Sequence, residues 1–571
     1  MSELEEVKFS LRVMMNKEEN KVLFAEVDSS FADVLISFLT LPLGTIVRLL
    51  AKHYADEAPR IGSLGTLYQG LVNLDSSNFW TERSKLTLLN PRNSFEPLCR
   101  KLKLNIDDSE LIKYFVCQRS GCKKHKSRQE CVSIYGGVEN CSCGSPLDTE
   151  VTFKTTDSND AGVFTEHKAS FLISDDLWMS PNLVGSSIKI LNDLGITDID
   201  GLEETTVVVG IKEIVNLLKG SLVSRTLLTD VVLDRSKVVS TSVKSDLGAS
   251  LGQITERATS KRMIVKAIIH KATNRVILAQ ADNDFVDFLF NLLTLPLAKV
   301  GSLLDGNTSL GSVDNLYSSV ANLKGGIYLK DFQPMLPTLK YFFKSEIFPL
   351  TENDTPALYV CRAFSQTGYV TYLASEEQED GFVTCRPLLF KDMNEKESYV
   401  KGPRMFMVTD DLIVTPSSVM SSFSILNRLK IPLSDVEEHA FEIGTKEALS
   451  ILKACLTSTS ALTDGLKPFM KGQSKKMKQE KDMDGKGSYV KGPSMFMVSD
   501  DLVVTPPSSI SSLTVLNNLN TPLSDVEELT FEIGRQQALC ILKASLTSTS
   551  ALTDALKPFI ERQLKKVKQE D

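Results

Sequence analysis

The chain has 571 residues, of which 42% are apolar and 24% are charged, and its formal net charge is −8 at pH 7. This composition is typical of globular proteins and excludes a collagen, a wholly disordered chain and a bundle of membrane helices. The length predicts roughly four domains. Because the overall balance is acidic, a nucleic-acid partner would need a local basic patch.

The amino terminus favours a cytoplasmic and/or nuclear location. MSELEEVKFS is acidic and lacks the basic and apolar regions of a secretory signal. The apolar stretches Phe31–Leu50 and Phe285–Val300 contain uncharged runs shorter than the roughly 20 residues that span a bilayer, so no membrane partner is expected. The ten cysteines are then expected to be reduced, and clustered cysteines suggest a metal before disulfides.

Hydrophobic periodicity predicts the first elements. Apolar and polar residues alternate over residues 7–13, which is the period of a half-buried strand, and a second strand is expected at Val22–Val27. Asp28 or Ser29 can then cap a helix that carries an apolar stripe. Pro42 is expected to interrupt or kink this helix.

A cysteine-rich segment follows, with two short-spaced pairs. Cys117 and Cys122 form the first pair, and Cys141 and Cys143 form the second, directly ahead of Gly144. Two such pairs on opposite sides of a loop can supply four thiolates to a tetrahedral zinc, and a glycine after the second pair permits a tight turn. A structural zinc is expected, and unmetallated surface thiols are the alternative.

Two further residues of this segment, Cys131 and His125, could substitute for one ligand. The equivalent part of the second unit keeps only Cys361 and Cys385. Because two thiolates cannot close a tetrahedral site, that part is expected to fold without metal, which favours a structural role for the zinc of the first unit. The basic run at residues 123–128 is a local patch that could contact phosphate.

The later elements are clearest between residues 405 and 466. They are predicted as a strand at Met405–Val408, a turn at Thr409–Asp411, a strand at Leu412–Thr415, a helix, a strand at His439–Ile443, a helix at Lys446–Leu456 and an extended segment at Ala461–Leu466. This order resembles a ubiquitin-like β-grasp by analogy alone, and other small α+β sandwiches fit about as well. The expected fold class is α+β, as tandem small modules with a zinc-ribbon-like insertion in the first unit.

Adjacent aspartates recur at equivalent positions, as Asp175 and Asp176, Asp410 and Asp411, and Asp500 and Asp501. Such pairs could form a metal site or an acid/base dyad. However, neighbouring strand residues point to opposite faces and aspartate is a preferred turn residue, so hairpin turns are predicted. No catalytic and no cofactor-binding residues are assigned, because the five histidines are not shared between copies and no GxGxxG or GxxxxGK[ST] motif occurs.

Internal repeats divide the chain into units. Residues 17–43 recur as 271–297, residues 171–181 recur as 406–416 and 496–506, and residues 391–480 align without a gap on 481–570 at about two thirds identity. The chain therefore contains two full units and a surplus half. Because this half was copied alone, it is expected to fold alone or to dock on its twin.

The predicted domains follow these repeats and the polar stretches between them. They are an α+β module at 1–110, a cysteine-rich zinc-ribbon-like segment at 111–165, an α+β module at 166–234, a linker at 235–260, an α+β module at 261–350, a degenerate cysteine segment at 351–397, an α+β module at 398–470, a linker at 471–487 and the duplicated module at 488–571.

The motifs together resemble a known family. They are NKVLFAE, an F-x-D-x-L helix ending in LTLPLG, GSLGTLY, a CSCG cluster and SDDL-x-x-x-P, in that order. This set resembles the plant family catalogued as domain of unknown function 674, and the resemblance covers nearly the whole chain. It implies a plant origin and no established activity, and it supports the four cysteines at 117, 122, 141 and 143 as matches to the family's pattern.

Repeated modules without a recognised catalytic motif favour a non-catalytic protein-interaction or scaffolding protein with one structural zinc. Protein partners are expected. A nucleic-acid-associated protein that uses the basic cysteine loop is a less favoured alternative. An enzyme of unfamiliar type is the other alternative, and a deep pocket lined by polar side chains from several elements would favour it.

Overall fold

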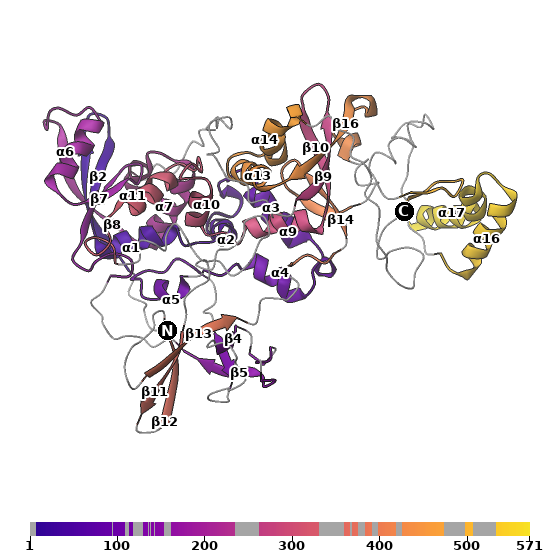
Figure 1. The fold of residues 1–571 in the computed structure, drawn as a ribbon. Coiled ribbons are helices and arrows are strands. Elements are labelled where there is room, and N and C mark those ends of the chain that lie inside the picture. Colours follow the sequence, from indigo (N-terminus) through magenta and orange to yellow (C-terminus); the bar gives the residue numbers. More distant parts are fainter. Residues whose placement is uncertain are drawn as a thin grey trace.

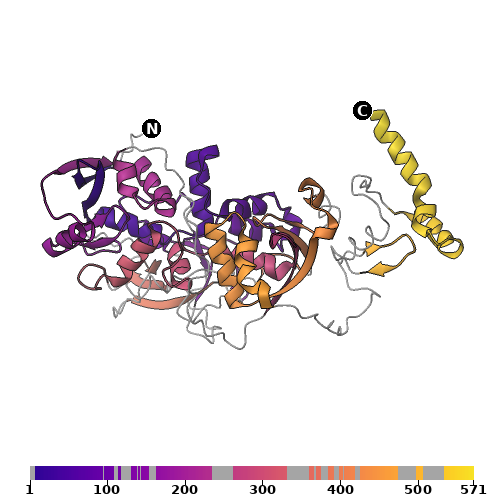
Figure 2. The same ribbon diagram turned by 90° about the horizontal axis from the view of Figure 1, so that it is seen from above.

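A computed structural model gives the fold of the chain. It describes residues 7–93, 95–108, 113–117, 130–152 without 135, 138 and 142, 162–233, 262–330, 359–365, 368–374, 383–390, 398–417 without 403, 425–472, 497–505 and 533–570. Two equivalent units lie side by side, a third sheet lies beside them, and the C-terminal elements lie apart (Figure 1). The view from above shows the same separation of the C-terminal elements (Figure 2).

Unit 1 is built on a five-stranded antiparallel sheet of order β7-β6-β2-β1-β8. Its strands are β1 (Phe9–Asn16), β2 (Lys21–Asp28), β6 (Ser170–Ser174), β7 (Met179–Pro181) and β8 (Leu202–Val209). Its helices are α1 (Ser29–Phe38), α2 (Leu43–Tyr54), α3 (Leu64–Asn73), α4 (Glu82–Leu89), α5 (Glu96–Cys99), α6 (Val184–Asp193), α7 (Ile211–Val223) and α8 (Leu227–Val232). One sheet thus joins strands from the segments 1–110 and 166–234.

Unit 2 repeats this sheet in the order β15-β14-β10-β9-β16. Its strands are β9 (Met263–His270), β10 (Arg275–Asp282), β14 (Met405–Thr409), β15 (Val414–Pro416) and β16 (Val436–Ile443). Its helices are α9 (Asn283–Leu292), α10 (Leu297–Leu303), α11 (Val313–Asn322), α13 (Thr445–Thr457) and α14 (Ala461–Leu466). The strands predicted near 405 and 412 and the helix predicted near 446 are confirmed, and each begins within two residues of its predicted start. The strand predicted near 439 is also confirmed, but β16 begins three residues earlier than predicted.

The hairpin and capped helix predicted at the start of unit 1 are confirmed. The carboxylate of Asp28 accepts a hydrogen bond from the Phe31 N–H at 2.8 Å, which caps α1. Helix α1 ends at Phe38, and Pro42 precedes the first residue of α2. The proline therefore separates two helices, because its ring cannot continue the first one.

The extended segment predicted at Ala461–Leu466 is wrong, because these residues form α14. The Ser458 hydroxyl donates to the Asp464 carboxylate at 2.6 Å, and the Ser460 N–H donates to the Ser458 hydroxyl at 2.9 Å. These bonds close a turn that starts a helix. The sheet is completed by β9 and β10 instead, so the ubiquitin-like strand order is not confirmed and the fold is described as mixed α+β.

The two units dock on each other through their LTLPL repeats. The Leu43 N–H donates to the Leu295 carbonyl at 3.0 Å, and the Leu297 N–H donates to the Leu41 carbonyl at 3.0 Å. Each repeat is thus the antiparallel partner of its own copy. This reciprocal contact gives the pair of units an approximate twofold arrangement.

The GS motif of each unit also binds the last long helix of the other unit. The Ser63 N–H donates to the Cys455 carbonyl of α13 at 2.8 Å, and the Ser312 N–H donates to the Ser221 carbonyl of α7 at 3.0 Å. Gly62 has a φ of +47°, and a Cβ on it would lie 2.3 Å from the Cys455 oxygen, so the approach requires glycine. Side chains of both units form one hydrophobic core. The units are therefore interdependent.

A six-stranded sheet of order β12-β11-β13-β4-β3-β5 joins the two cysteine segments. Its strands are β3 (Tyr114–Cys117), β4 (Glu130–Ser133), β5 (Leu147–Val151), β11 (Tyr359–Ser365), β12 (Gly368–Ala374) and β13 (Val383–Phe390). Strand β13 pairs in parallel with β4. A part-buried ion pair between Glu130 and Arg362 also links the two segments.

A disulfide joins Cys361 to Cys385, which corrects the expectation that the cysteines are all reduced. The two residues lie directly opposite each other on the antiparallel strands β11 and β13, with their Cα atoms 4.1 Å apart. The sequence places them 24 residues apart and does not show that they share a strand register. Strand pairing therefore created the contact.

The C-terminal duplicate contains a short hairpin and two helices. They are β17 (Met497–Val498), β18 (Val504–Thr505), α16 (Arg535–Thr547) and α17 (Ala551–Glu570). A small apolar cluster joins α16, α17 and the hairpin turn. Within the described part of the chain, no helix has both the length and the apolar character needed to span a bilayer. The predicted linkers at 235–260 and, from residue 473 on, at 471–487 lie outside the described residues.

Candidate functional site

Three of the four predicted zinc ligands lie together. The Sγ atoms of Cys117, Cys141 and Cys143 are all within 4.8 Å of one another, and those of Cys117 and Cys143 are 3.6 Å apart. In a tetrahedral site with zinc–sulfur bonds of about 2.3 Å, the sulfurs lie about 3.8 Å from one another. The spacing fits a thiolate-bound metal, so this cluster could hold a metal ion.

A strand end and a tight turn position these sulfurs. Cys117 is the last residue of β3, whereas Cys141 and Cys143 lie in the loop between β4 and β5. The Gly144 N–H donates to the Cys141 carbonyl at 2.8 Å, and Gly144 has a φ of +84°. This left-handed conformation favours glycine, as expected for the residue that follows the second pair.

The cluster is largely shielded from solvent. Cys117, Cys131, Cys141 and Leu147 form a small buried group, and Cys143 is half-buried beside it. Burial raises the pKa of the Cys141 thiol. A buried thiol is deprotonated most readily when a cation stabilises the thiolate, so the environment suits metal coordination better than a free reactive thiol.

The fourth predicted ligand, Cys122, lies outside the described residues, as do His125 and the basic run at 123–128. Cys131, the other predicted substitute, is buried on β4. Its sulfur is not one of the three that lie within 4.8 Å of one another. The described part of the site therefore contributes three sulfur donors.

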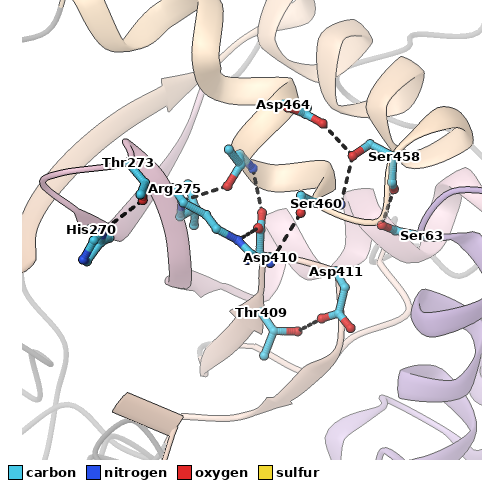
Figure 3. A network of polar contacts seen from close by, with 12 residues as sticks. Ser63, His270, Thr273, Arg275, Thr409, Asp410, Asp411, Ser458, Ser460 and Asp464 are labelled. Carbon is cyan, nitrogen blue, oxygen red and sulfur yellow. Dashed lines mark hydrogen bonds and ion pairs between the residues drawn. The ribbon is translucent and has the colours of Figure 1, made fainter. Parts of the chain in front are cut away.

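The paired aspartates form hairpin turns, as predicted. In unit 2 the carboxylate of Asp410 accepts from the Thr463 N–H at 2.8 Å. It also accepts from Arg275 at 3.0 Å (Figure 3). The same bond to a threonine N–H is made in the other copies, by Asp175 with Thr229 and by Asp500 with Thr553. The first aspartate of each pair thus holds the start of a helix that follows about 53 residues later.

The second aspartate of each pair closes the turn itself. In unit 2 the Thr409 hydroxyl donates to the Asp411 carboxylate at 2.5 Å (Figure 3). The next residue, Leu412, has a φ of +68° and a fully buried side chain. Because the two carboxylates bind different partners, the pair does not form the shared site of an acid/base dyad.

Sequence reasoning missed a second set of buried carboxylates. Asp33 on α1 accepts from the N–H groups of Val163, Phe164 and Thr165. Its counterpart Asp287 on α9 accepts from two backbone N–H groups, at residues 399 and 400. The recurrence of aspartate within both copies of the F-x-D-x-L motif was the available signal.

Burial raises the pKa of these structural carboxylates. It raises the pKa of Asp287 to about 7, although the Val400 and Tyr399 N–H groups lower it. It also raises the pKa of Asp175 to about 6, against the opposing hydrogen bonds from Thr229. The cause in both cases is loss of hydration of the charged form, which outweighs the donors.

An open depression of about 530 Å³ lies between residues 166–170 and 326–328. Its lining includes Glu166, His167, Lys168 and Tyr328. None of these residues belongs to the motifs shared between the copies. The depression is open, whereas an enzyme pocket is typically a deep cleft.

One family model matches the chain, over residues 5–446 and 469–570, and it is described as a protein of unknown function (DUF674). No curated protein and no solved structure matches the chain.

Proposed function

The chain belongs to the DUF674 family, whose description assigns no activity, and from that premise we propose that it is a non-catalytic protein-interaction or scaffolding protein with one structural zinc site. The zinc would be held by Cys117, Cys122, Cys141 and Cys143, in a zinc-ribbon-like segment. Cys131 or His125 could replace Cys122.

The observation that carries the proposal is the place of the three gathered sulfurs. They bring together the end of β3 and the loop before β5, within the sheet that both cysteine segments share. A zinc with four cysteine ligands has no open position for water or substrate. When bound, it would supply a cross-link that fixes the edge of this sheet.

The repeated polar residues support the same proposal. The buried aspartates of the hairpin turns and of helices α1 and α9 each accept hydrogen bonds from the backbone. These bonds hold segments that are distant in the sequence, and they leave those carboxylates occupied in structural contacts. The residues that the copies share are therefore explained by packing and turns.

Two alternatives rest on other features. A nucleic-acid-associated protein would use the basic run at 123–128. An enzyme of unfamiliar type would use the open depression near His167. We favour protein partners, in the cytoplasm and/or nucleus, because repeated sheets with exposed edges suit peptide and strand recognition.

Metal analysis of the full chain tests the zinc site. We expect one zinc per chain in the unsubstituted protein and none in Cys141→Ser. Cys540→Ser is the matched control, because Cys540 is exposed on α16 and should leave the metal content unchanged. A full chain without stoichiometric metal would reject the site.

Affinity capture with the full chain, followed by mass spectrometry, tests the scaffolding role. We expect specific protein partners whose retention does not change with salt as steeply as nucleic-acid binding does. Retention on RNA or DNA that falls steeply with salt would favour the first alternative. Turnover in a substrate screen, with no captured partner, would favour an enzyme.

A further inference from the structure

The C-terminal duplicate exposes apolar side chains that its twin in unit 2 buries. Leu449 and Leu452 of α13 are 2% and 0% exposed, whereas the equivalent Leu539 and Leu542 of α16 are 57% and 58% exposed. The residues are identical, and only their surroundings differ. The difference in exposed fraction therefore arises because these leucines lack, in the duplicate, the packing that buries them in the twin. It does not arise from a change of sequence.

The same contrast continues along the hairpin. Val414 on β15 is 2% exposed, and the equivalent Val504 on β18 is 60% exposed. Val408 and Val498 are 0% and 41% exposed. Together with the two leucines of α16, these residues define a face that we call the duplicate face. A face that holds several exposed large apolar side chains is typical of an interaction site.

The duplicate nevertheless keeps the internal bonds of a formed module. The Asp500 carboxylate accepts from the Thr553 N–H at 2.7 Å and from the Thr553 hydroxyl at 3.0 Å, as Asp175 does with Thr229 in unit 1. Leu502 has a φ of +65°, close to the +68° of Leu412. Its exposed face is thus presented on the same local framework as in the twin.

The structure shows what covers the twin. Strand β10 pairs with β14, and helix α9 lies against both strands. The Val276 N–H of β10 also donates to the Thr463 hydroxyl at 2.8 Å, and the Val22 N–H of β2 donates to the equivalent Thr229 in unit 1. In the described part of the duplicate, Thr553 has no such contact to a hairpin strand.

The sequence contains no third copy of this hairpin segment. The SDDL half occurs three times, but the preceding half with the VLFAE-type hairpin occurs twice, at residues 17–43 and 271–297. Both of these are already paired, β2 with β6 and β10 with β14. A second copy of this chain has the same imbalance, so an exchange between two copies would uncover one face for each face that it covers.

We propose that the duplicate face is a docking site for the N-terminal half of a family unit carried by another polypeptide, that is, an antiparallel hairpin followed by an apolar helix, as in residues 263–292. The hairpin would add a strand to β17, as β10 does to β14, and the helix would lie against the strands, as α9 lies against β10 and β14. This inference deepens the proposed function, on which it rests, because it names the surface and the class of partner.

Titration of the full chain with a defined probe tests the proposal. The probe is residues 262–296 of this sequence, which carry the hairpin and helix, fused to a soluble carrier protein. We expect saturable binding, measured by calorimetry or by fluorescence anisotropy, and at least tenfold weaker binding by Leu539→Gln/Leu542→Gln. Glutamine keeps a high helix propensity, so α16 should still form, and circular dichroism checks this.

Two controls separate the duplicate face from unit 2. Gln536→Lys places the twin's own residue at a position that is exposed in both copies, and it should bind the probe as the unsubstituted chain does. A chain that ends at residue 480 keeps both paired units, and it should not bind. Equal binding by this shorter chain would mean that the probe enters unit 2, which would overturn the proposal.

The remaining outcomes are also decisive. No binding by the full chain would overturn the proposal, and so would a dimer that Leu539→Gln/Leu542→Gln dissociates in sedimentation, because the occupant would then be a second copy. If the probe fails while affinity capture still returns partners, only this inference falls. If the probe binds while the zinc test fails, the metal site falls and the docking site stands.

Discussion

Unit 1 and unit 2 share one architecture, but they use sulfur in two ways. In unit 1 three cysteines gather at distances that suit a metal, whereas in unit 2 Cys361 and Cys385 form a disulfide. Both arrangements lie in the same six-stranded sheet. The difference teaches that two neighbouring strands can be held by a direct bond where the residues of a metal site are lacking.

The two units make equivalent contacts to each other at their interface. Each GS motif binds the other unit's helix, and each LTLPL repeat pairs with its copy. These reciprocal contacts cannot change in one unit without affecting the other. The cysteine segments are less constrained, because each contributes its own strands to the joint sheet. The following experiments test this contrast.

The largest effect is expected where the units touch most closely. Gly62→Ala should lower the free energy of unfolding by about 4 kcal/mol and Gly311→Ala by about 3 kcal/mol. A Cβ would lie 2.3 Å from the Cys455 oxygen at Gly62 and 2.8 Å from the Ser224 oxygen at Gly311, and both glycines have positive φ. Urea unfolding of the full chain measures the losses.

Gly65→Ala is the control for this pair. Gly65 lies on α3 with no atom within 4 Å of an added Cβ, so alanine should keep or slightly raise the stability. A Gly62→Ala protein as stable as Gly65→Ala would show that the units do not meet as described.

The zinc site and the disulfide should respond independently to substitution of their cysteines. Cys361→Ala/Cys385→Ala should cost about 3 kcal/mol, since the bond closes a loop of moderate length, and should leave the zinc content unchanged. Cys141→Ser should remove the zinc and leave the disulfide. Metal analysis, thiol titration and hydrogen exchange in β11 and β13 measure these outcomes. Loss of zinc from the double variant would mean that the two sites depend on each other.

A comparable effect is expected from pH. Because burial raises the pKa of Asp287 to about 7, the folded protein keeps a proton that the unfolded chain releases near pH 4. This group's contribution to stability is therefore greatest below pH 4 and is lost as the pH rises to about 7, by about 4 kcal/mol in all.

Asp287→Asn should remove that part of the pH dependence. Its amide oxygen can still accept from the N–H groups of Tyr399 and Val400, which the carboxylate contacts at 2.7 and 3.0 Å. Unfolding measured from pH 4 to pH 7 should be flatter for Asp287→Asn than for the unsubstituted chain. Glu18→Gln is an exposed control. An unchanged slope in Asp287→Asn would contradict the assignment.

The smallest effect compares the second aspartates of two turns. The Asp176 carboxylate accepts from Asn315 of unit 2 at 2.8 Å, in addition to the Ser174 hydroxyl. By contrast, the Asp411 carboxylate accepts from the Thr409 hydroxyl within its own turn. Asp176→Ala should therefore cost about 1.5 kcal/mol and Asp411→Ala about 1 kcal/mol in urea unfolding. Equal losses would mean that the bond between the units adds nothing.

Local patterns made much of the fold predictable. The alternation at residues 7–13 and the cap at Asp28 depend on neighbours in the sequence, so the first hairpin and α1 follow from periodicity and capping. The segment Ala461–Leu466 was assigned wrongly because a short apolar run fits a strand or a helix equally well. The bonds among Ser458, Ser460 and Asp464 decide for the helix.

The candidate site was predictable to a similar extent. The spacing of Cys117, Cys141 and Cys143 indicated that the three sulfurs meet, since short-spaced pairs on either side of a loop suit one metal. The disulfide was not predictable, because it needs the register of β11 against β13. Nor were the bonds of Asp33 to residues 163–165, which lie about 130 positions away.

The sequence by itself determined the repeats, the capped helices, the hairpin turns and the pairs of cysteines, because each depends on residues a few positions apart. Only the tertiary structure decided that each unit completes the other, that the cysteine segments share a sheet, and that the duplicate face is left uncovered. The physical reason is that burial and strand pairing are properties of contacts between distant segments, so identical leucines can be core residues in one copy and surface residues in the other.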